Sequence, residues 1–216
     1  MDHELKALFK ALLTKTAKDI DRISFEQEPN YTAAFFGKMH NEELTSSSGQ
    51  KLKLTFSVSN DRGPGSAEKK TGIDIGMVFK WINQENDDVI FEKAIFAQAK
   101  NRLLELSTHE ETALAAQCQL MKRHTNSYIT LDCPYDSTPP KICQSSDTMP
   151  YWKNDSPIEL GEYLCDIVFE CKDGDQTQKV IEMAKRSNRT FTIETNAPHP
   201  EIAMRNTSKK HNRPSR

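Results

Sequence analysis

Three polar residues in the middle of the chain have the types and spacing that metal-assisted phosphodiester hydrolysis requires. Asp74 lies in the segment GIDIG, and Gln98 and Lys100 lie two residues apart in IFAQAK. Because side chains alternate between the faces of a strand, Gln98 and Lys100 share one face at a strand's end. Carboxylate and amide oxygens can hold a hard cation that polarises a phosphate, and a lysine can stabilise the developing negative charge. The three residues are therefore the candidate site.

Asp74 can reach this pair if the two segments form a hairpin. TGIDIGMVFKWIN and VIFEKAIFAQAK are rich in β-forming residues, and the turn-forming stretch NQENDD separates them. Antiparallel pairing about this turn sets residue 74 opposite residues 97 to 98. A buried acid and a buried lysine at the end of a sheet are costly unless they pair or bind metal. The alternative is that Lys100 leaves the sheet edge into solvent and that Asp74 only begins a turn.

Hydrophobic periodicity predicts the other elements. Apolar residues recur at helical spacing over residues 2–22, and a second helix is predicted from Pro29, which suits a first helical turn, to about residue 44. Alternation in KLKLTFSVS predicts a strand, with a loop after it at residues 60–70. The remaining predictions are a helix capped by Thr108, a strand at SYITLDC, a long loop over 132–158 with a short strand at KIC, helices at LGEYLCDIVFEC and VIEMAKR, and a strand at RTFTIET.

The order of these elements resembles the PD-(D/E)XK nuclease superfamily. That core is a helix, three strands, a helix and a fourth strand, with Asp on the second strand and (E/Q)xK on the third. Here the match is GIDIG and IFAQAK, within residues 28–131. The glutamine resembles the D…QxK variant of Mrr-like restriction endonucleases. The resemblance implies an α/β fold with a restriction endonuclease-like core, whose mixed central sheet of about four to five strands is flanked by helices.

The resemblance also implies a role for each site residue. Asp74 and Gln98 would bind Mg²⁺ or Mn²⁺, the glutamine through a neutral carbonyl oxygen and therefore weakly. Lys100 would position the attacking water and stabilise the transition state. Glu28 resembles the acid that such nucleases often carry on the helix before the first strand, and Gln117 the polar residue on the helix after the QxK strand. The alternatives are that Glu28 only satisfies a helix dipole and that Gln117 is an ordinary surface or core residue.

Other charged residues near these motifs have simpler interpretations. Glu68 is favoured as a loop residue over an extra metal ligand. Glu92 shares the face of Gln98 but lies about 20 Å away, at roughly 3.3 Å per residue, which is too far for the same metal. A basic rim for phosphates, or an ordinary solvated surface, is predicted at Lys69, Lys70, Arg102, Lys122 and Arg123.

Length and composition favour one domain. The 216 residues, 36% of them hydrophobic, predict a single domain over residues 1–200, with N-terminal helices, a core at about 28–131 and C-terminal helices and a strand at about 158–196. Residues 201–216 are predicted to be a disordered basic tail, which could alternatively follow a phosphate backbone. The formal net charge of −2 gives no electrostatic argument for a nucleic-acid partner.

The same sequence predicts an intracellular protein. No stretch approaches the roughly 18 apolar residues of a membrane span, and charges interrupt the N-terminal 20 residues, which excludes a signal peptide. We therefore expect no membrane partner and a cytoplasmic location, or delivery into a target cell if the protein is an effector or toxin. The five cysteines are odd in number and lack CxxC spacing, so reduced, mostly buried thiols are favoured over zinc ligands or disulfides.

These features predict a Mg²⁺- or Mn²⁺-dependent endonuclease that cleaves DNA rather than RNA, in restriction, phage defence or as a toxin. Whether it forms a homodimer is left open. One alternative is a catalytically inactive nuclease-fold module that binds nucleic acid or protein, which the glutamine and the weak net charge motivate. Another is a coincidental resemblance in an unrelated α/β adaptor or effector.

Overall fold

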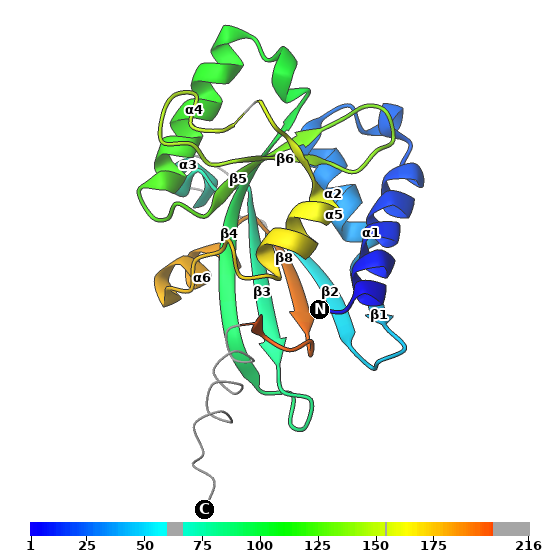
Figure 1. The fold of residues 1–216 in the computed structure, drawn as a ribbon. Coiled ribbons are helices and arrows are strands. Elements are labelled where there is room, and N and C mark those ends of the chain that lie inside the picture. The colour runs from blue at the N-terminus through cyan, green and yellow to red at the C-terminus, as the bar shows by residue number, and fades with distance from the viewer. Residues whose placement is uncertain (60–66, 154, 201–216) are drawn as a thin grey trace, which may run out of the picture.

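The computed structural model describes residues 1–59, 67–153 and 155–200 and has one mixed sheet with helices on both faces (Figure 1). The strand order is β1-β2-β8-β3-β4-β5-β6-β7. The predicted α/β class, with a mixed sheet flanked by helices, is confirmed. The predicted strand number of four to five is wrong, since the sheet has eight strands. Its edges are extended by β1 and β7, which are three and two residues long and too short to show periodicity in the sequence.

The bounds of the elements are as follows. The strands are β1 (Glu43–Thr45), β2 (Lys51–Val58), β3 (Ile75–Ile82), β4 (Val89–Asn101), β5 (Tyr128–Cys133), β6 (Lys141–Gln144), β7 (Ile158–Glu159) and β8 (Arg189–Thr195). The α-helices are α1 (His3–Lys18), α2 (Glu28–Lys38), α3 (Ala67–Thr71), α4 (Thr108–Lys122), α5 (Leu160–Glu162) and α6 (Gln178–Lys185). Two 3₁₀-helices, η1 (Arg22–Phe25) and η2 (Leu103–Glu105), and one π-helix, η3 (Tyr163–Val168), complete the set.

The predicted hairpin is confirmed, and it lies beside a strand from the far end of the chain. β3 and β4 pair antiparallel with Ile75 opposite Ala97. On the other side of β3, β8 runs parallel to it, with Arg189 opposite Ile75. β2 therefore does not neighbour β3, because β8 lies between them. The centre of the sheet thus includes a C-terminal strand and is not confined to residues 28–131.

Two hydrophobic cores, one on each face, fix the position of the sheet. Alternation along β4 sends Ile95 and Ala97 into the core under α1, α2, α5 and η3, and sends Ala94 and Phe96 into the core under α4 and α6. All four side chains are fully buried. Helices therefore cover both faces of β4, as Figure 1 shows for the central strands. A polar side chain near the end of this strand is accordingly surrounded by other groups of the protein.

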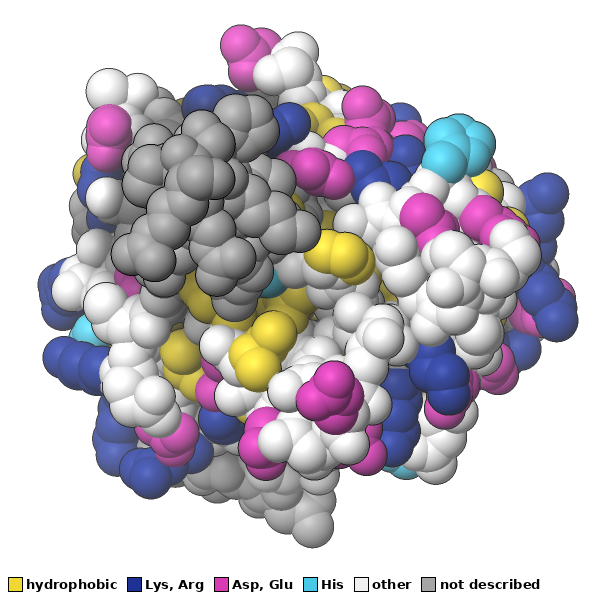
Figure 2. All heavy atoms as spheres, turned by 60° about the horizontal axis from the view of Figure 1, so that its bottom comes forward, with side chains coloured by type: hydrophobic (Ala, Val, Ile, Leu, Met, Phe, Trp, Pro, Cys, Tyr) yellow, Lys and Arg dark blue, Asp and Glu magenta, His cyan; other side chains and the backbone are white. Residues whose placement is uncertain are grey.

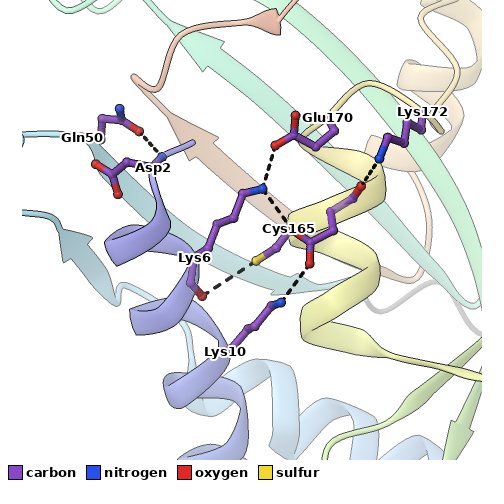
Figure 3. Close-up of polar contacts among 8 residues, drawn as sticks. Asp2, Lys6, Lys10, Gln50, Cys165, Glu170 and Lys172 are labelled. Carbon is purple, nitrogen blue, oxygen red and sulfur yellow. Dashed lines mark hydrogen bonds and ion pairs between the residues drawn. The ribbon is translucent and has the colours of Figure 1, made fainter.

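Ion pairs attach α1 to η3 and to the turn after it (Figure 3). The Lys6 ammonium contacts Asp166 at 3.0 Å and Glu170 at 2.7 Å, and Lys10 contacts Asp166 at 2.9 Å. These groups are partly exposed, so each pair stabilises the fold by only a fraction of a kcal/mol, roughly 0.2–1. The network orients α1, and the buried face of that helix supplies more of the stability.

Several predicted element boundaries are corrected. α2 has Pro29 in its first turn, as predicted, but ends at Lys38 and not near residue 44. The cap of α4 is Ser107 and not Thr108, because Ser107 and Glu110 form a reciprocal capping box. The predicted loop at residues 60–70 contains α3, and residues 60–66 lie outside the described residues. The predicted tail at residues 201–216 also lies outside them.

Two further expectations concern cysteines and membranes. The five cysteines all lie among the described residues and none is in a disulfide; four are buried and Cys171 is partly exposed. Among the helices of the described residues, none has the length and apolar character needed to cross a bilayer.

Candidate active site

The candidate site lies where β3 and β8 begin and β4 ends (Figure 1). The Asp74 backbone amide donates to the Ala97 carbonyl oxygen at 3.1 Å, which continues the hairpin register and sets Asp74 opposite Gln98. Gln98 is 1% exposed, and Lys100, two residues further along β4, is partly buried. The hairpin thus brings Asp74 to the end of β4 that carries the other two predicted residues.

Gly72 joins the loop before Asp74 to β4 and to α4. Its φ of +76° suits glycine, and a Cβ there would lie 2.3 Å from the Gln117 backbone oxygen. The Gly72 carbonyl oxygen accepts a hydrogen bond from the Gln98 amide nitrogen at 2.6 Å. This bond orients the Gln98 amide so that its carbonyl oxygen points away from Gly72.

Gln117 therefore packs through its backbone against the loop that leads to Asp74. Its side chain is partly buried, and its Oε1 atom is buried with no hydrogen-bond partner among the described residues. A buried amide oxygen without a donor is energetically unfavourable, by about 1–3 kcal/mol. Gln117 thus has an oxygen available to a ligand, but it is not shown to contact Asp74 or Lys100.

Glu28 and Asp74 share one electrostatic environment. Glu28 is the first residue of α2, and burial, together with the negative charge of Asp74, raises the pKa of its carboxyl to about 8. Burial also raises the pKa of Asp74 to about 6, while the positive charges of Arg189 and Lys100 lower it. The two acids act on each other differently: the charge of Asp74 raises the pKa of Glu28, whereas a hydrogen bond from Glu28 lowers the pKa of Asp74. Neighbouring buried carboxyls with raised pKa values are typical of acid–base and metal sites.

Arg189 is a member of the site that sequence reasoning missed. Its guanidinium Nη1 donates to Asp74 Oδ1 in a close ion pair, and the two side chains are 15% and 8% exposed. The other carboxylate oxygen, Asp74 Oδ2, is buried and accepts no hydrogen bond from an N–H group or hydroxyl of the described residues. No signal in the sequence marked Arg189, because its place beside Asp74 depends on the parallel pairing of β8 with β3.

Glu68 lies beside the site, on a short helix. It sits on α3, not in a loop, and its Oε2 atom accepts a hydrogen bond from Asn188 Nδ2 at 3.3 Å. Its negative charge raises the pKa of Asp74. A cavity of about 300 Å³ lies between Glu68, Asn188, Arg189 and the first turn of α2. The site therefore has an adjoining polar space.

The oxygen atoms at this site suit a hard divalent cation. Asp74 Oδ2 lacks a donor, the carbonyl oxygen of Gln98 points away from Gly72, and the Glu28 carboxyl becomes an anion once it loses its proton. Within the described residues, however, no group of three His, Cys, Asp or Glu side chains is placed to hold a metal ion. A cation here would therefore have to complete its coordination with amide or backbone oxygens, water or substrate.

Three of the other predicted charged residues form ion pairs. Glu92 pairs with Lys185 at 2.9 Å. Of the predicted basic rim, Arg102 pairs with Glu105 at 3.1 Å and Lys122 with Asp147 at 2.8 Å. The two pairs of the rim lie at the surface, where an ion pair contributes little to stability.

The opposite end of β3, which carries the turn into β4, is a less suitable surface for a polyanion. Figure 2 brings this end forward and shows basic and acidic side chains interspersed. A cavity of about 360 Å³ there has both signs on its walls, and Lys51 pairs with Glu43 across 3.3 Å. Charge pattern therefore does not favour this end over the candidate site.

No protein-family model, curated protein or solved structure matches this chain.

Proposed function

We propose that this chain is a Mg²⁺- or Mn²⁺-dependent nuclease with a PD-(D/E)XK-like core. The observation that carries the proposal is the meeting of Asp74 and Glu28 with the charge of Lys100 at one end of β3 and β4. Burying two acids side by side is unfavourable unless a cation or a proton compensates them. A catalytic metal site gives this arrangement a function.

Asp74 and Gln98 are the proposed metal ligands. Asp74 supplies the charge, through the oxygen that lacks a donor, and Gln98 supplies a neutral carbonyl oxygen. A bound divalent cation would polarise the phosphate and lower the pKa of a coordinated water. The neutral amide leaves the site with less negative charge than two carboxylates would, so the proposed affinity for Mg²⁺ is modest.

Lys100 and Glu28 are the proposed charge and proton partners. The positive charge of Lys100 lowers the pKa of both acids. An ammonium in that position can orient the attacking water and stabilise the negative charge of the pentavalent phosphate. With a pKa of about 8, Glu28 holds a proton at neutral pH and can give it to, or take it from, a group nearby.

The substrate and location follow from the resemblance rather than from the site. We propose DNA over RNA as substrate, cleaved internally, and action in the cytoplasm or in a cell into which the protein is delivered. The basic segment at residues 201–216 could add phosphate contacts.

A second candidate function is a catalytically inactive module that binds nucleic acid or protein. Two observations favour it: Gln98 replaces the commoner glutamate, and the Arg189 guanidinium already neutralises Asp74. With that ion pair in place, the site is stable without a metal ion.

A cleavage assay separates the two candidates. Purified full-length protein is incubated with supercoiled plasmid, linear duplex, single-stranded DNA and RNA, each with Mg²⁺, Mn²⁺ or EDTA. Metal-dependent cleavage of the DNA substrates supports the nuclease. Binding to the same substrates without cleavage in any metal supports the module.

A further inference from the structure

The two oxygens of the Asp74 carboxylate have different surroundings. Oδ1 accepts from Arg189, whereas Oδ2 is buried and accepts from no N–H group or hydroxyl of the described residues. The pairing of β8 with β3 fixes the backbone of Arg189, so a break in the ion pair would involve only its side chain. Arg189 also lines the cavity of about 300 Å³ beside the site. The guanidinium therefore has a second position available close to Asp74.

A divalent cation on Asp74 would weaken this ion pair, because two positive charges would then share one carboxylate. A cation on Asp74 would stand within a few ångströms of the Arg189 charge, in a part of the protein where both side chains are largely shielded from water. The repulsion is removed if the long arginine side chain turns away. Its planar guanidinium is suited to bidentate contact with a phosphate once it is released.

We infer that Arg189 is the internal counter-ion of this site: a divalent cation displaces it from Asp74, and the freed guanidinium turns into the adjoining cavity to bind a substrate phosphate. The inference rests on the metal site of the proposed function. Arg189 is on this account a positioning residue in the metal-free protein. The ion pair prevents a buried charge from being left without compensation when no metal is bound.

Metal affinity tests the competition without reference to cleavage. Mn²⁺ binding to the full chain is measured at pH 8 by electron paramagnetic resonance of the free ion, for wild type, R189Q, R189K and R186Q. R189Q should bind Mn²⁺ about tenfold more tightly than wild type, since the competitor is gone, whereas R189K, which keeps the charge, should lie within about threefold of wild type. R186Q is the matched control, because Arg186 is 82% exposed, and its affinity should not change. An R189Q affinity equal to or weaker than that of wild type overturns the inference.

A measurement on the wild type covers the case in which R189Q does not fold. The side-chain Nε–H signal of Arg189, assigned by its absence from R189K, is followed by nuclear magnetic resonance during Mg²⁺ titration. It should shift and exchange faster with water as the ion pair breaks, and an unchanged signal at saturating Mg²⁺ overturns the inference. If Mn²⁺ binds to wild type and to R189Q with the same affinity, only this inference fails. If Mn²⁺ binds to none of the proteins, the metal site fails with it.

Discussion

The Gln98 amide nitrogen donates to the Gly72 carbonyl oxygen at 2.6 Å. This bond changes what Gln98→Glu would do. A carboxylate at this position would face the Gly72 carbonyl oxygen, and neither group could donate a hydrogen bond to the other. The loss of this bond should destabilise the metal-free fold by about 1–3 kcal/mol. The added negative charge should nevertheless tighten divalent-metal binding. We therefore predict that Gln98→Glu unfolds at lower urea concentration than wild type without metal and regains stability with Mn²⁺. If the variant is as stable as wild type and its metal affinity is unchanged, Gln98 neither stabilises the fold through Gly72 nor binds the metal.

The raised pKa of Glu28 predicts a pH-dependent stability. Its pKa is about 8 in the folded protein against an ordinary value of 4.5, so the native state binds the proton more tightly than the unfolded state. Its contribution is therefore present below about pH 4.5 and is lost as the pH rises to 8. Glu28→Gln lacks this loss, so its free energy of unfolding should rise relative to that of wild type by about 3–4 kcal/mol between pH 5 and pH 8, since one pKa unit corresponds to about 1.4 kcal/mol. Urea unfolding of the metal-free proteins measures the difference, and a constant difference across that range would show that Glu28 is not perturbed.

The same pKa values predict that metal binding strengthens as the pH rises. The Asp74 carboxyl, with a pKa of about 6, must lose its proton before it can bind a cation, and the charge that Glu28 gains on losing its own proton adds to the attraction. Mn²⁺ affinity measured by calorimetry should rise from pH 6 to pH 8, and less steeply in Glu28→Gln. Affinity independent of pH would exclude Asp74 as a ligand.

Gly76 offers a test of the packing that positions Asp74. A Cβ at Gly76 would lie 2.1 Å from the Ala184 carbonyl oxygen of α6, so Gly76→Ala must push α6 away from β3. We predict a destabilisation of at least about 1–3 kcal/mol. Gly37→Ala is the matched control. Gly37 lies in helix α2, and a Cβ there would contact only the Phe56 side chain, at 3.9 Å. Gly37→Ala should be neutral or stabilising by up to about 1 kcal/mol. Equal thermal unfolding of the two variants would contradict the close packing of α6.

The sequence predicted the elements that have strong periodicity and a local partner. The alternating residues of β2, the apolar pattern of α1 and the β3–β4 hairpin were all identified, and the hairpin register followed from the length of its turn. The same hairpin register predicts that Asp74 lies opposite Gln98. These contacts depend on neighbours in the sequence, which a single sequence can report.

The part that was missed depends on contacts between distant segments. β8 inserts next to β3 from more than 100 residues away, and no local pattern indicates which strand it will pair with. Arg189 and Asn188 therefore went unnoticed, although they reach Asp74 and Glu68. The short strands β1 and β7 were missed because pairing, and not composition, makes them strands.

The central claim is that the end of β3 and β4 hydrolyses phosphodiesters, and one comparison tests it most directly. Cleavage of supercoiled plasmid with Mn²⁺ is measured for wild type, Lys100→Ala and Lys15→Ala, whose lysine is exposed on α1. After circular dichroism has shown that all three are folded, wild type and Lys15→Ala should cleave at the same rate, and Lys100→Ala should lose at least 100-fold, about 2.7 kcal/mol of transition-state stabilisation. Equal cleavage by Lys100→Ala and wild type, or no cleavage by any of them, would contradict the account.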